Sequence, residues 1–222
     1  NHPPYGRELW ITNATPQGTR LVKDIQNGDL SSNIRHLCAH AGEVFFNAND
    51  GVHGNELWRS DGSPENTVLV RDIHPGAPSS GPYSLCSAGA WLFFLANDGV
   101  HGTELWRTDG TPENTVLVKD IAPGVAASNP WSLAEMDGLL YFCVTSPVYG
   151  EEVWVSDGTE DGTRVLRDIV PGTGSSGPHN LTDFHGTLFF TCDDGFHGEE
   201  LWMSDGTKEG TRIAADIRAP RV

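Results

Sequence analysis

The segment ELWRTDGT, residues 104–111, is followed at 115–121 by TVLVKDI. Near-copies of the first segment begin at Glu8, Glu56, Glu152 and Glu200. Their tryptophans are Trp10, Trp58, Trp106, Trp154 and Trp202, each 48 residues after the one before. No insertion or deletion separates any two copies. A tandem repeat of this length is close to the period of known propeller blades, so one supersecondary unit per repeat is the expected architecture.

Each repeat is expected to contain four short strands. In the copy quoted above they fall at 84–87, 91–95, 104–108 and 115–121. The second is an aromatic run typical of a buried strand, and the fourth is rich in β-branched residues. Turn residues separate the strands, and no stretch shows helical periodicity. The sequence therefore predicts an all-β fold, a β-propeller of four-stranded antiparallel blades whose first strand is innermost.

The whole chain, 1–222, is interpreted as one propeller domain. Its repeat units are approximately 1–34, 35–82, 83–130, 131–178 and 179–222. Five copies of the third and fourth strands are present, but only four copies of the first and second. Three explanations are open: a five-bladed ring closed by strands from both ends, residues missing upstream of Asn1, or strands supplied by another chain. A five-bladed ring is the expected form, and completion by another chain stays a possibility.

Composition restricts the classes of partner. The chain has 30 acidic and 14 basic residues, a formal net charge of −16, which argues against nucleic acid because phosphates would be repelled. Hydrophobic residues make up 37% of the chain, enough for a packed core. No apolar run is long enough for a membrane helix, so no membrane insertion is expected. No segment resembles a signal peptide, so one was either removed or never present.

The repeated text resembles the ELWxxDGT-repeat proteins, a family of secreted and surface proteins of bacteria. The match covers essentially the whole chain in a single register. The first copy departs at 11–15, and the fourth has Val153 in place of leucine. The resemblance implies a propeller-like β-repeat fold and an extracellular setting. It implies little about activity, because the family has no well-established common chemistry.

Several repeated residues are interpreted as structural. A tryptophan at one position of every unit is expected to fill the gap between adjacent blades. The aspartate of each Asp-Ile pair, as in Asp120-Ile121, is expected to accept backbone N–H groups at a strand end. The Asp-Gly turns, such as Asp109-Gly110, are interpreted in the same way.

The pattern Asp-Gly-x-His-Gly occurs at 50–54, 98–102 and 194–198, between the second and third strands. It is lost in the corresponding segments 146–150 and 2–6. A carboxylate with nearby carbonyls suits calcium, and aspartate with histidine suits a softer metal or a sugar hydroxyl. The candidate metal ligands are Asp50, His53, Asp98, His101, Asp194 and His197. The alternative is a plain turn held by the aspartate, and the candidate cofactor is calcium.

One position varies in chemistry beside an otherwise uniform leucine. It holds Arg35, Tyr83, Trp131 and His179, at the start of the innermost strand of each unit. These four residues are expected to surround one mouth of the central channel, at the same end as the Asp-Gly-x-His-Gly loops. Their side chains suit stacking on a ligand and hydrogen bonding to it. The alternative is a rim that packs against the proline- and serine-rich linkers.

The four cysteines are Cys38, Cys86, Cys143 and Cys192. The first two share one repeat position, so a disulfide between neighbouring blades is conceivable. The other two are out of register by one residue and should point to opposite sheet faces. His36, Cys38 and His40 alternate along one strand and are a weak candidate for a metal set.

No nucleophile elbow, zinc-protease helix motif, phosphate loop or dinucleotide fingerprint is present. The leading hypothesis is a secreted, non-enzymatic binding module with lectin-like recognition of carbohydrate or another extracellular polymer. The first alternative is a structural protein that assembles into homo-oligomers or filaments, in which another chain completes the incomplete repeat. The second alternative is an enzyme with its site at the channel mouth.

Overall fold

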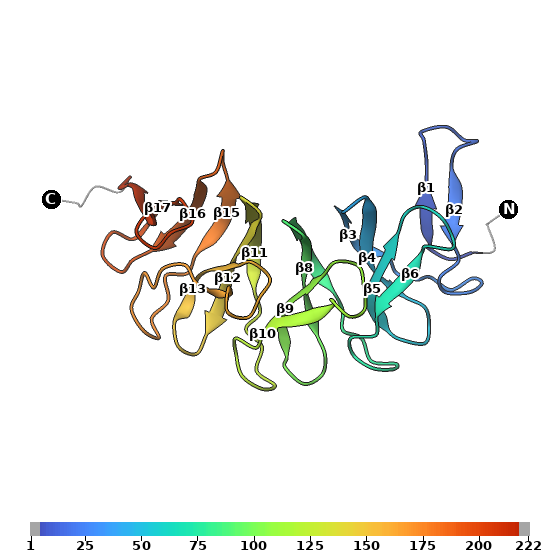
Figure 1. Ribbon diagram of the computed structural model, residues 1–222, viewed down its shortest axis with the longest axis horizontal. Coiled ribbons are helices and arrows are strands. Elements are labelled where there is room, and N and C mark those ends of the chain that lie inside the picture. Colours follow the sequence, from blue (N-terminus) through green and yellow to red (C-terminus); the bar gives the residue numbers. More distant parts are fainter. Residues whose placement is uncertain (1–4, 218–222) are drawn as a thin grey trace.

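A computed structural model describes residues 5–217, which form eighteen strands in five sheets (Figure 1). We number the sheets as blades. Blade 1 holds β1 (Leu9–Ile11) and β2 (Arg20–Lys23). Blade 2 holds β3 (Arg35–His40), β4 (Glu43–Asn49), β5 (Asn55–Ser60) and β6 (Val68–Arg71). Blade 3 holds β7 (Tyr83–Ala88), β8 (Trp91–Asn97), β9 (Thr103–Thr108) and β10 (Val116–Lys119). Blade 4 holds β11 (Trp131–Met136), β12 (Leu139–Ser146), β13 (Gly150–Ser156) and β14 (Arg164–Val165). Blade 5 holds β15 (His179–Asp183), β16 (Leu188–Asp193), β17 (Glu199–Ser204) and β18 (Arg212–Ala215).

Within each blade the strands pair antiparallel in chain order. The first strands of successive complete blades, β3, β7, β11 and β15, contact one another in turn, which places them innermost. The prediction of an all-β propeller with a 48-residue blade is therefore confirmed. The chain-terminal strands do not share a blade as expected for ring closure. Within the described residues β1 pairs only with β2, and β15–β18 form a sheet of their own.

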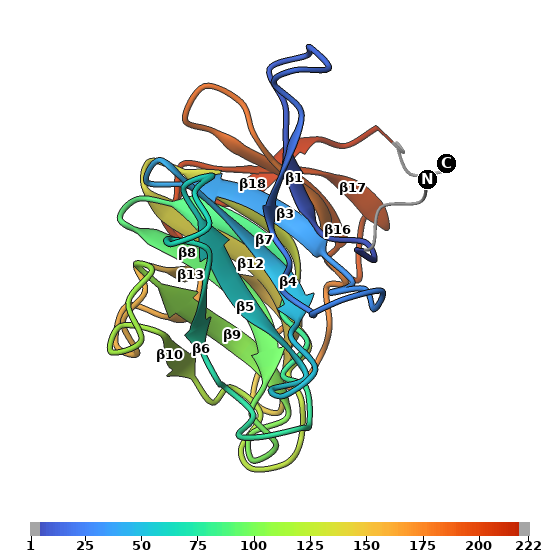
Figure 2. The ribbon, with the colours of Figure 1, turned by 90° about the vertical axis from the view of Figure 1, so that its right-hand side faces the viewer.

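The blades follow one another along an open arc (Figure 1). Blade 1 and blade 5 lie at opposite ends of this arc, and the turn between β1 and β2 projects away from the other sheets in both ribbon views (Figures 1 and 2). Four hydrophobic clusters lie between successive blades. Stacking of neighbouring blades, rather than one central core, therefore stabilises the molecule.

Four of the five repeat tryptophans fill the gap to the preceding blade, as predicted. Trp106 of blade 3 is 6% exposed and belongs to the same cluster as Phe45, Leu57 and Ile73 of blade 2. Trp58, Trp154 and Trp202 occupy equivalent places. Trp10 is 46% exposed, because no sheet precedes β1 in the described part of the chain.

The glutamate before each Leu-Trp or Val-Trp pair has a structural role that the sequence did not reveal. Glu56 is completely buried and accepts hydrogen bonds from Ile73 N at 3.1 Å, Ser80 N at 2.8 Å and Ser80 Oγ at 2.5 Å. Burial raises the pKa of Glu56, while these hydrogen bonds lower it in part. The carboxylate thus ties β5 to the linker that leads into the next blade.

The same contact recurs in the other blades. Glu8, Glu104, Glu152 and Glu200 each accept a backbone N–H from the residue 17 or 18 positions further on. Burial raises the pKa of Glu152 to about 7, against opposing hydrogen bonds from Val170 and Ser176. These carboxylates satisfy backbone donors that would otherwise be buried without partners.

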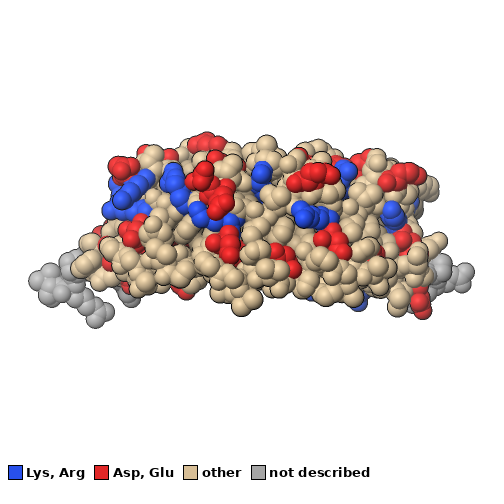
Figure 3. Space-filling view, turned by 60° about the horizontal axis from the view of Figure 1, so that its bottom comes forward, with Lys and Arg blue, Asp and Glu red and all other residues tan. Residues whose placement is uncertain are grey.

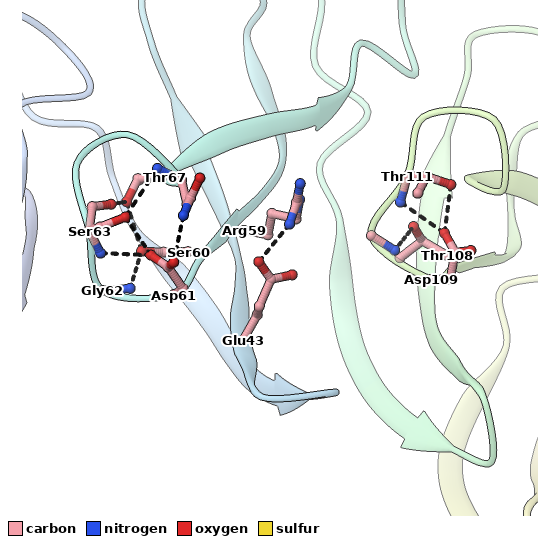
Figure 4. A network of polar contacts seen from close by, with 12 residues as sticks. Glu43, Arg59, Ser60, Asp61, Gly62, Ser63, Thr67, Thr108, Asp109 and Thr111 are labelled. Atoms are coloured by element: carbon pink, nitrogen blue, oxygen red, sulfur yellow. Dashed lines mark hydrogen bonds and ion pairs between the residues drawn. The ribbon is translucent and has the colours of Figure 1, made fainter.

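The aspartates of the repeat hold turns, as predicted. Asp72 Oδ2 accepts the Gly76 N–H at 2.9 Å, and equivalent bonds occur in three other blades. In the turn after β9, Asp109 Oδ1 accepts from Thr111 N at 2.9 Å and Thr111 Oγ1 at 2.7 Å (Figure 4). Such bonds fix the backbone direction between strands.

Cations on the outer strands, or just after the outer strand in blade 4, connect neighbouring blades. Lys23, Arg71, Lys119 and Arg167 each donate to the carbonyl of a threonine 44 residues further on. At the equivalent position in blade 5 the cation is replaced by Ala215. On the face drawn in Figure 3, Lys and Arg are interspersed with Asp and Glu, and no continuous basic stripe crosses it.

Candidate ligand-binding site

The variable position lies at the first residue of each innermost strand. Arg35, Tyr83, Trp131 and His179 begin β3, β7, β11 and β15. They pair with Asn47, Leu95, Cys143 and Thr191 on the second strands. Because each second strand ends just beyond this pair, the Asp-Gly-x-His-Gly loops emerge at the same end of the blades. We call this end of the innermost strands the rim.

A β-bulge follows each rim residue. The next residues, His36, Ser84, Ser132 and Asn180, have φ of 55°, 51°, 53° and 61°. The strand register shifts at each of these points. No glycine marks the positions, so the sequence offered no signal for them. A bulge re-aims the side chain beside it, and bulges are common near functional sites.

The bulge also removes the basis of the predicted His36, Cys38 and His40 set, because strict alternation does not hold across it. His36 lies against the Tyr83 ring, with centroids 6.3 Å apart. His40 Nδ1 is 2.8 Å from Ser87 Oγ. Within residues 5–217 no group of three or more His, Cys, Asp or Glu side chains is placed to hold a metal ion.

The four rim residues differ in how strongly the fold holds them. Trp131 is half-buried, packs against the cluster between blades 4 and 5, and donates from Nε1 to Pro178 O at 3.2 Å. Tyr83 is half-buried and packs against the cluster between blades 3 and 4, and burial raises its pKa. His179 Nε2 is 3.2 Å from Glu199 Oε1. The Arg35 side chain is exposed and makes no hydrogen bond or ion pair with any described residue.

A polar cavity of about 370 Å³ opens at Arg35. Its lining residues are Asn33, Arg35, His36, Asn47, Asn55 and Gly81. Asn47 is only 7% exposed, and its Nδ2 donates to Pro82 O at 3.0 Å. Its Oδ1 is buried and has no hydrogen-bond partner in the structure. A buried acceptor without a donor costs free energy, so this amide marks a place where a ligand or water can supply one.

A cavity of about 350 Å³ also lies in blade 5, where its lining includes Thr191 and Glu199, the residues equivalent to Asn47 and Asn55. The residues equivalent to Asn47 are Leu95, Cys143 and Thr191, and Leu95 and Cys143 are completely buried in the inter-blade clusters. The equivalent residue in blade 5, Thr191, is polar but carries no amide, so only blade 2 has a buried amide at this position. Sequence reasoning singled out Arg35 but missed Asn47, although comparison of the four copies at that position was a usable signal.

The three Asp-Gly-x-His-Gly loops are compact turns. Asp50 Oδ1 accepts from Val52 N at 2.9 Å and His53 N at 2.8 Å, and Oδ2 lies 2.7 Å from His53 Nδ1. The pairs Asp98–His101 and Asp194–His197 repeat this geometry, at 2.7 and 2.8 Å. The hydrogen bond to aspartate raises the pKa of each histidine. Burial would raise the pKa of each aspartate, but the bonds from the loop lower it.

Each loop carboxylate is therefore engaged by its own loop, which favours the turn interpretation over calcium binding. In the fourth blade Ser146 Oγ takes the place of the carboxylate, accepting from Val148 N at 3.2 Å and Tyr149 N at 3.4 Å. Of the N-terminal counterpart, 2–6, residues 2–4 lie outside the described part of the chain.

The cysteines are all free thiols. Cys143 and Cys192 lie on opposite faces of successive sheets, as predicted, and consequently both belong to the cluster between blades 4 and 5. Burial raises the pKa of both thiols. Cys38 and Cys86 are half-buried on neighbouring innermost strands. No described helix is long and apolar enough to span a membrane.

No protein-family model matches the chain, and no curated protein does either. Solved structures do resemble it. A prolyl endopeptidase matches with a TM-score of 0.56 and 13% identity, over 95% of this chain and 30% of its own. A puromycin hydrolase matches with a TM-score of 0.53 and 15% identity, over 90% and 30%. An α-L-arabinofuranosidase from Clostridium thermocellum gives a TM-score of only 0.34 at 15% identity, over 82% and 71%.

The chain thus spans about a third of the length of the first two structures. At these identities the likeness concerns the fold alone, a propeller-like arrangement of β-sheets.

Proposed function

We propose that this chain is a secreted, non-enzymatic binding module of the ELWxxDGT-repeat kind, with lectin-like recognition of carbohydrate or another extracellular polymer. The observation that carries the proposal is the polar cavity at Arg35, which opens on the rim among three asparagine side chains. Amides and a guanidinium are donors and acceptors suited to sugar hydroxyls. The extracellular setting is supported by the resemblance of the repeat.

The rim gives this module more than one place of contact. His179 is exposed, and Tyr83 and Trp131 are half-buried, so part of each ring is open to stack on a ligand. The innermost strands lie side by side, which brings these side chains onto one face. Weak contacts at several blades to one polymer would add through multivalency.

A glycan array with the purified chain tests this proposal. We expect binding to a group of related saccharides, weakened by Arg35→Gln and by Tyr83→Ala. Arg164→Gln is the matched control, because Arg164 is exposed on the outer strand β14. Binding that is equal in all variants would move the site away from the rim, and no binding to any saccharide or polymer would contradict the proposal.

A second candidate function is assembly with further propeller blades in a homo-oligomer or filament. Trp10 is 46% and Ile11 40% exposed, and they line a mainly apolar cavity of about 440 Å³ together with Leu37, itself 58% exposed. Equivalent tryptophans in the other blades are covered by a neighbouring sheet. Light scattering over a range of concentrations tests this, and assembly abolished by Trp10→Ser would support it. A monomer at every concentration would exclude it for this chain.

A further inference from the structure

The Asn47 amide is held in one orientation, and its oxygen lacks a hydrogen-bond donor in the described part of the chain. Its Nδ2 donates to Pro82 O, so the Oδ1 atom faces the other way and needs a donor. The residue as a whole is only 7% exposed. At the same repeat position blade 3 has Leu95, which is apolar and completely buried. The fold therefore does not require an amide here, and a ligand hydroxyl can supply the missing donor in place of water.

Arg35 lines the same cavity and lacks an anionic partner among residues 5–217. Its guanidinium carries a full positive charge, and no described group pairs with it. No Asp or Glu lines the cavity, although the chain holds 30 acidic residues. A guanidinium presents a planar set of donors that matches a carboxylate with two parallel hydrogen bonds.

We propose that this cavity is a subsite for a uronic acid, a sugar unit that carries both a carboxylate and ring hydroxyls. The inference rests on the proposed function and names the ligand class at its site. The carboxylate pairs with Arg35, and a ring hydroxyl donates to Asn47 Oδ1. The side-chain amides of Asn33 and Asn55 supply further donors and acceptors from the linker and from β5. A neutral sugar can donate a hydrogen bond to Asn47 but cannot pair with the charge of Arg35, whereas a simple anion can pair with Arg35 but has no hydroxyl for Asn47.

Two features of the protein modulate this contact. The net charge of −16 repels anions at long range, and salt screens that repulsion beyond about 10 Å at 0.1 M. Short oligomers at moderate salt are therefore the appropriate probes. Because Asn47 Oδ1 is itself buried, the proposed hydrogen bond requires the cavity wall to move, and the side-chain amide signals of Asn47 would report that movement.

The test is calorimetric titration with trigalacturonate and with neutral galactotriose at 0.15 M salt, on the wild type and three variants. We expect the acidic trimer to bind about ten-fold more tightly than the neutral one. Arg35→Gln removes this preference, whereas Asn47→Leu weakens both ligands about five-fold. Leucine is the native residue at the equivalent position in blade 3, so this variant keeps the fold. Arg164→Gln on β14 is the matched control and leaves both affinities unchanged.

A nuclear magnetic resonance titration adds a local readout: trigalacturonate shifts the Asn47 side-chain amide signals in the wild type. Equal binding of both trimers with no effect of Arg35→Gln overturns the uronic acid subsite and leaves the proposed function standing. Equal affinity for a sulfated trimer also overturns the carboxylate assignment. If neither trimer binds and the glycan array is negative, the subsite and the proposed function both fail.

Discussion

The interfaces between blades and the rim of the innermost strands differ in how far their residues repeat from one blade to the next. At the interfaces the same residue types recur in nearly every copy: a tryptophan in the gap, a buried glutamate that accepts hydrogen bonds from the linker, and a cation bonded to a threonine carbonyl. At the rim the equivalent residues are Arg35, Tyr83, Trp131 and His179, and the residue paired with Arg35 is a buried asparagine whose Oδ1 has no partner.

This difference separates stability from recognition. An interface position must fit the same neighbour in every copy, so one residue type is best everywhere. A rim position faces solvent on one side, so each blade can hold a different side chain without loss of the fold. Substitutions should therefore have large effects on stability at interfaces and small ones at the rim.

The largest effect is expected for tryptophan. Trp106→Ala should lower the free energy of unfolding by about 3–5 kcal/mol, because it leaves a large cavity between blades 2 and 3. Trp10→Ala should change it by less than about 0.5 kcal/mol, since that indole is 46% exposed. Urea unfolding of both variants measures the contrast. Similar values for the two substitutions would contradict the assignment of the inter-blade gap as core.

A smaller loss is expected at the buried glutamate. Glu104→Ala leaves the backbone N–H groups of Ile121 and Ser128 without their acceptor, which should cost about 2–3 kcal/mol. Glu113→Ala, at an exposed turn residue, is the control and should cost almost nothing. Chemical unfolding of the two variants tests this. An equal, small effect would show that water replaces the carboxylate.

Stability should fall as pH rises from 5 to 8. The folded-state pKa of Glu152, about 7, lies above its ordinary value of 4.5. Its protonated form therefore stabilises the folded state fully below pH 4.5, and this stabilisation is lost as the pH rises through 7. The raised pKa values of His53 and His101 act in the same direction above 6.5. Melting temperatures at several pH values should drop by a few degrees over this range, and Glu152→Gln should reduce the drop. A profile identical to that of the wild type would remove Glu152 as a cause.

The loops between second and third strands should show a modest, metal-independent effect. Asp98→Ala removes the acceptor for two backbone N–H groups and for His101, and we expect a loss of about 1 kcal/mol. Calcium and a chelator should leave the melting temperature of the wild type unchanged. A rise with calcium, since a ligand of the folded state stabilises it, would restore the metal hypothesis.

Only a small effect on stability is expected for Asn47→Leu. Loss of the hydrogen bond to Pro82 O is offset by removal of a buried oxygen that has no partner, so the change should stay below about 1 kcal/mol. Thermal unfolding beside the binding assay measures it. A loss of several kcal/mol would mean that Asn47 serves the fold rather than a ligand.

Much of this architecture could be predicted from the repeat. The strand positions, the tryptophan in the gap and the turn aspartates all follow from residue types recurring at 48-residue spacing. Ring closure did not follow, because pairing between the two chain ends depends on blade curvature, which a repeat count does not contain. The cluster His36, Cys38 and His40 failed as a metal set because a bulge without a glycine signature interrupts the strand.

The sequence by itself determined the all-β class, the blade length and the residues that fill each interface, since these depend on local propensity and hydrophobic pattern repeated in register. Tertiary structure alone decided where the buried glutamates find their donors, that Cys143 and Cys192 lie in one cluster, and that Asn47 and Arg35 line one cavity at the rim. These relations join residues from different strands, linkers and blades. Their chemistry depends on burial and on the direction of individual hydrogen bonds, which only the packed chain defines.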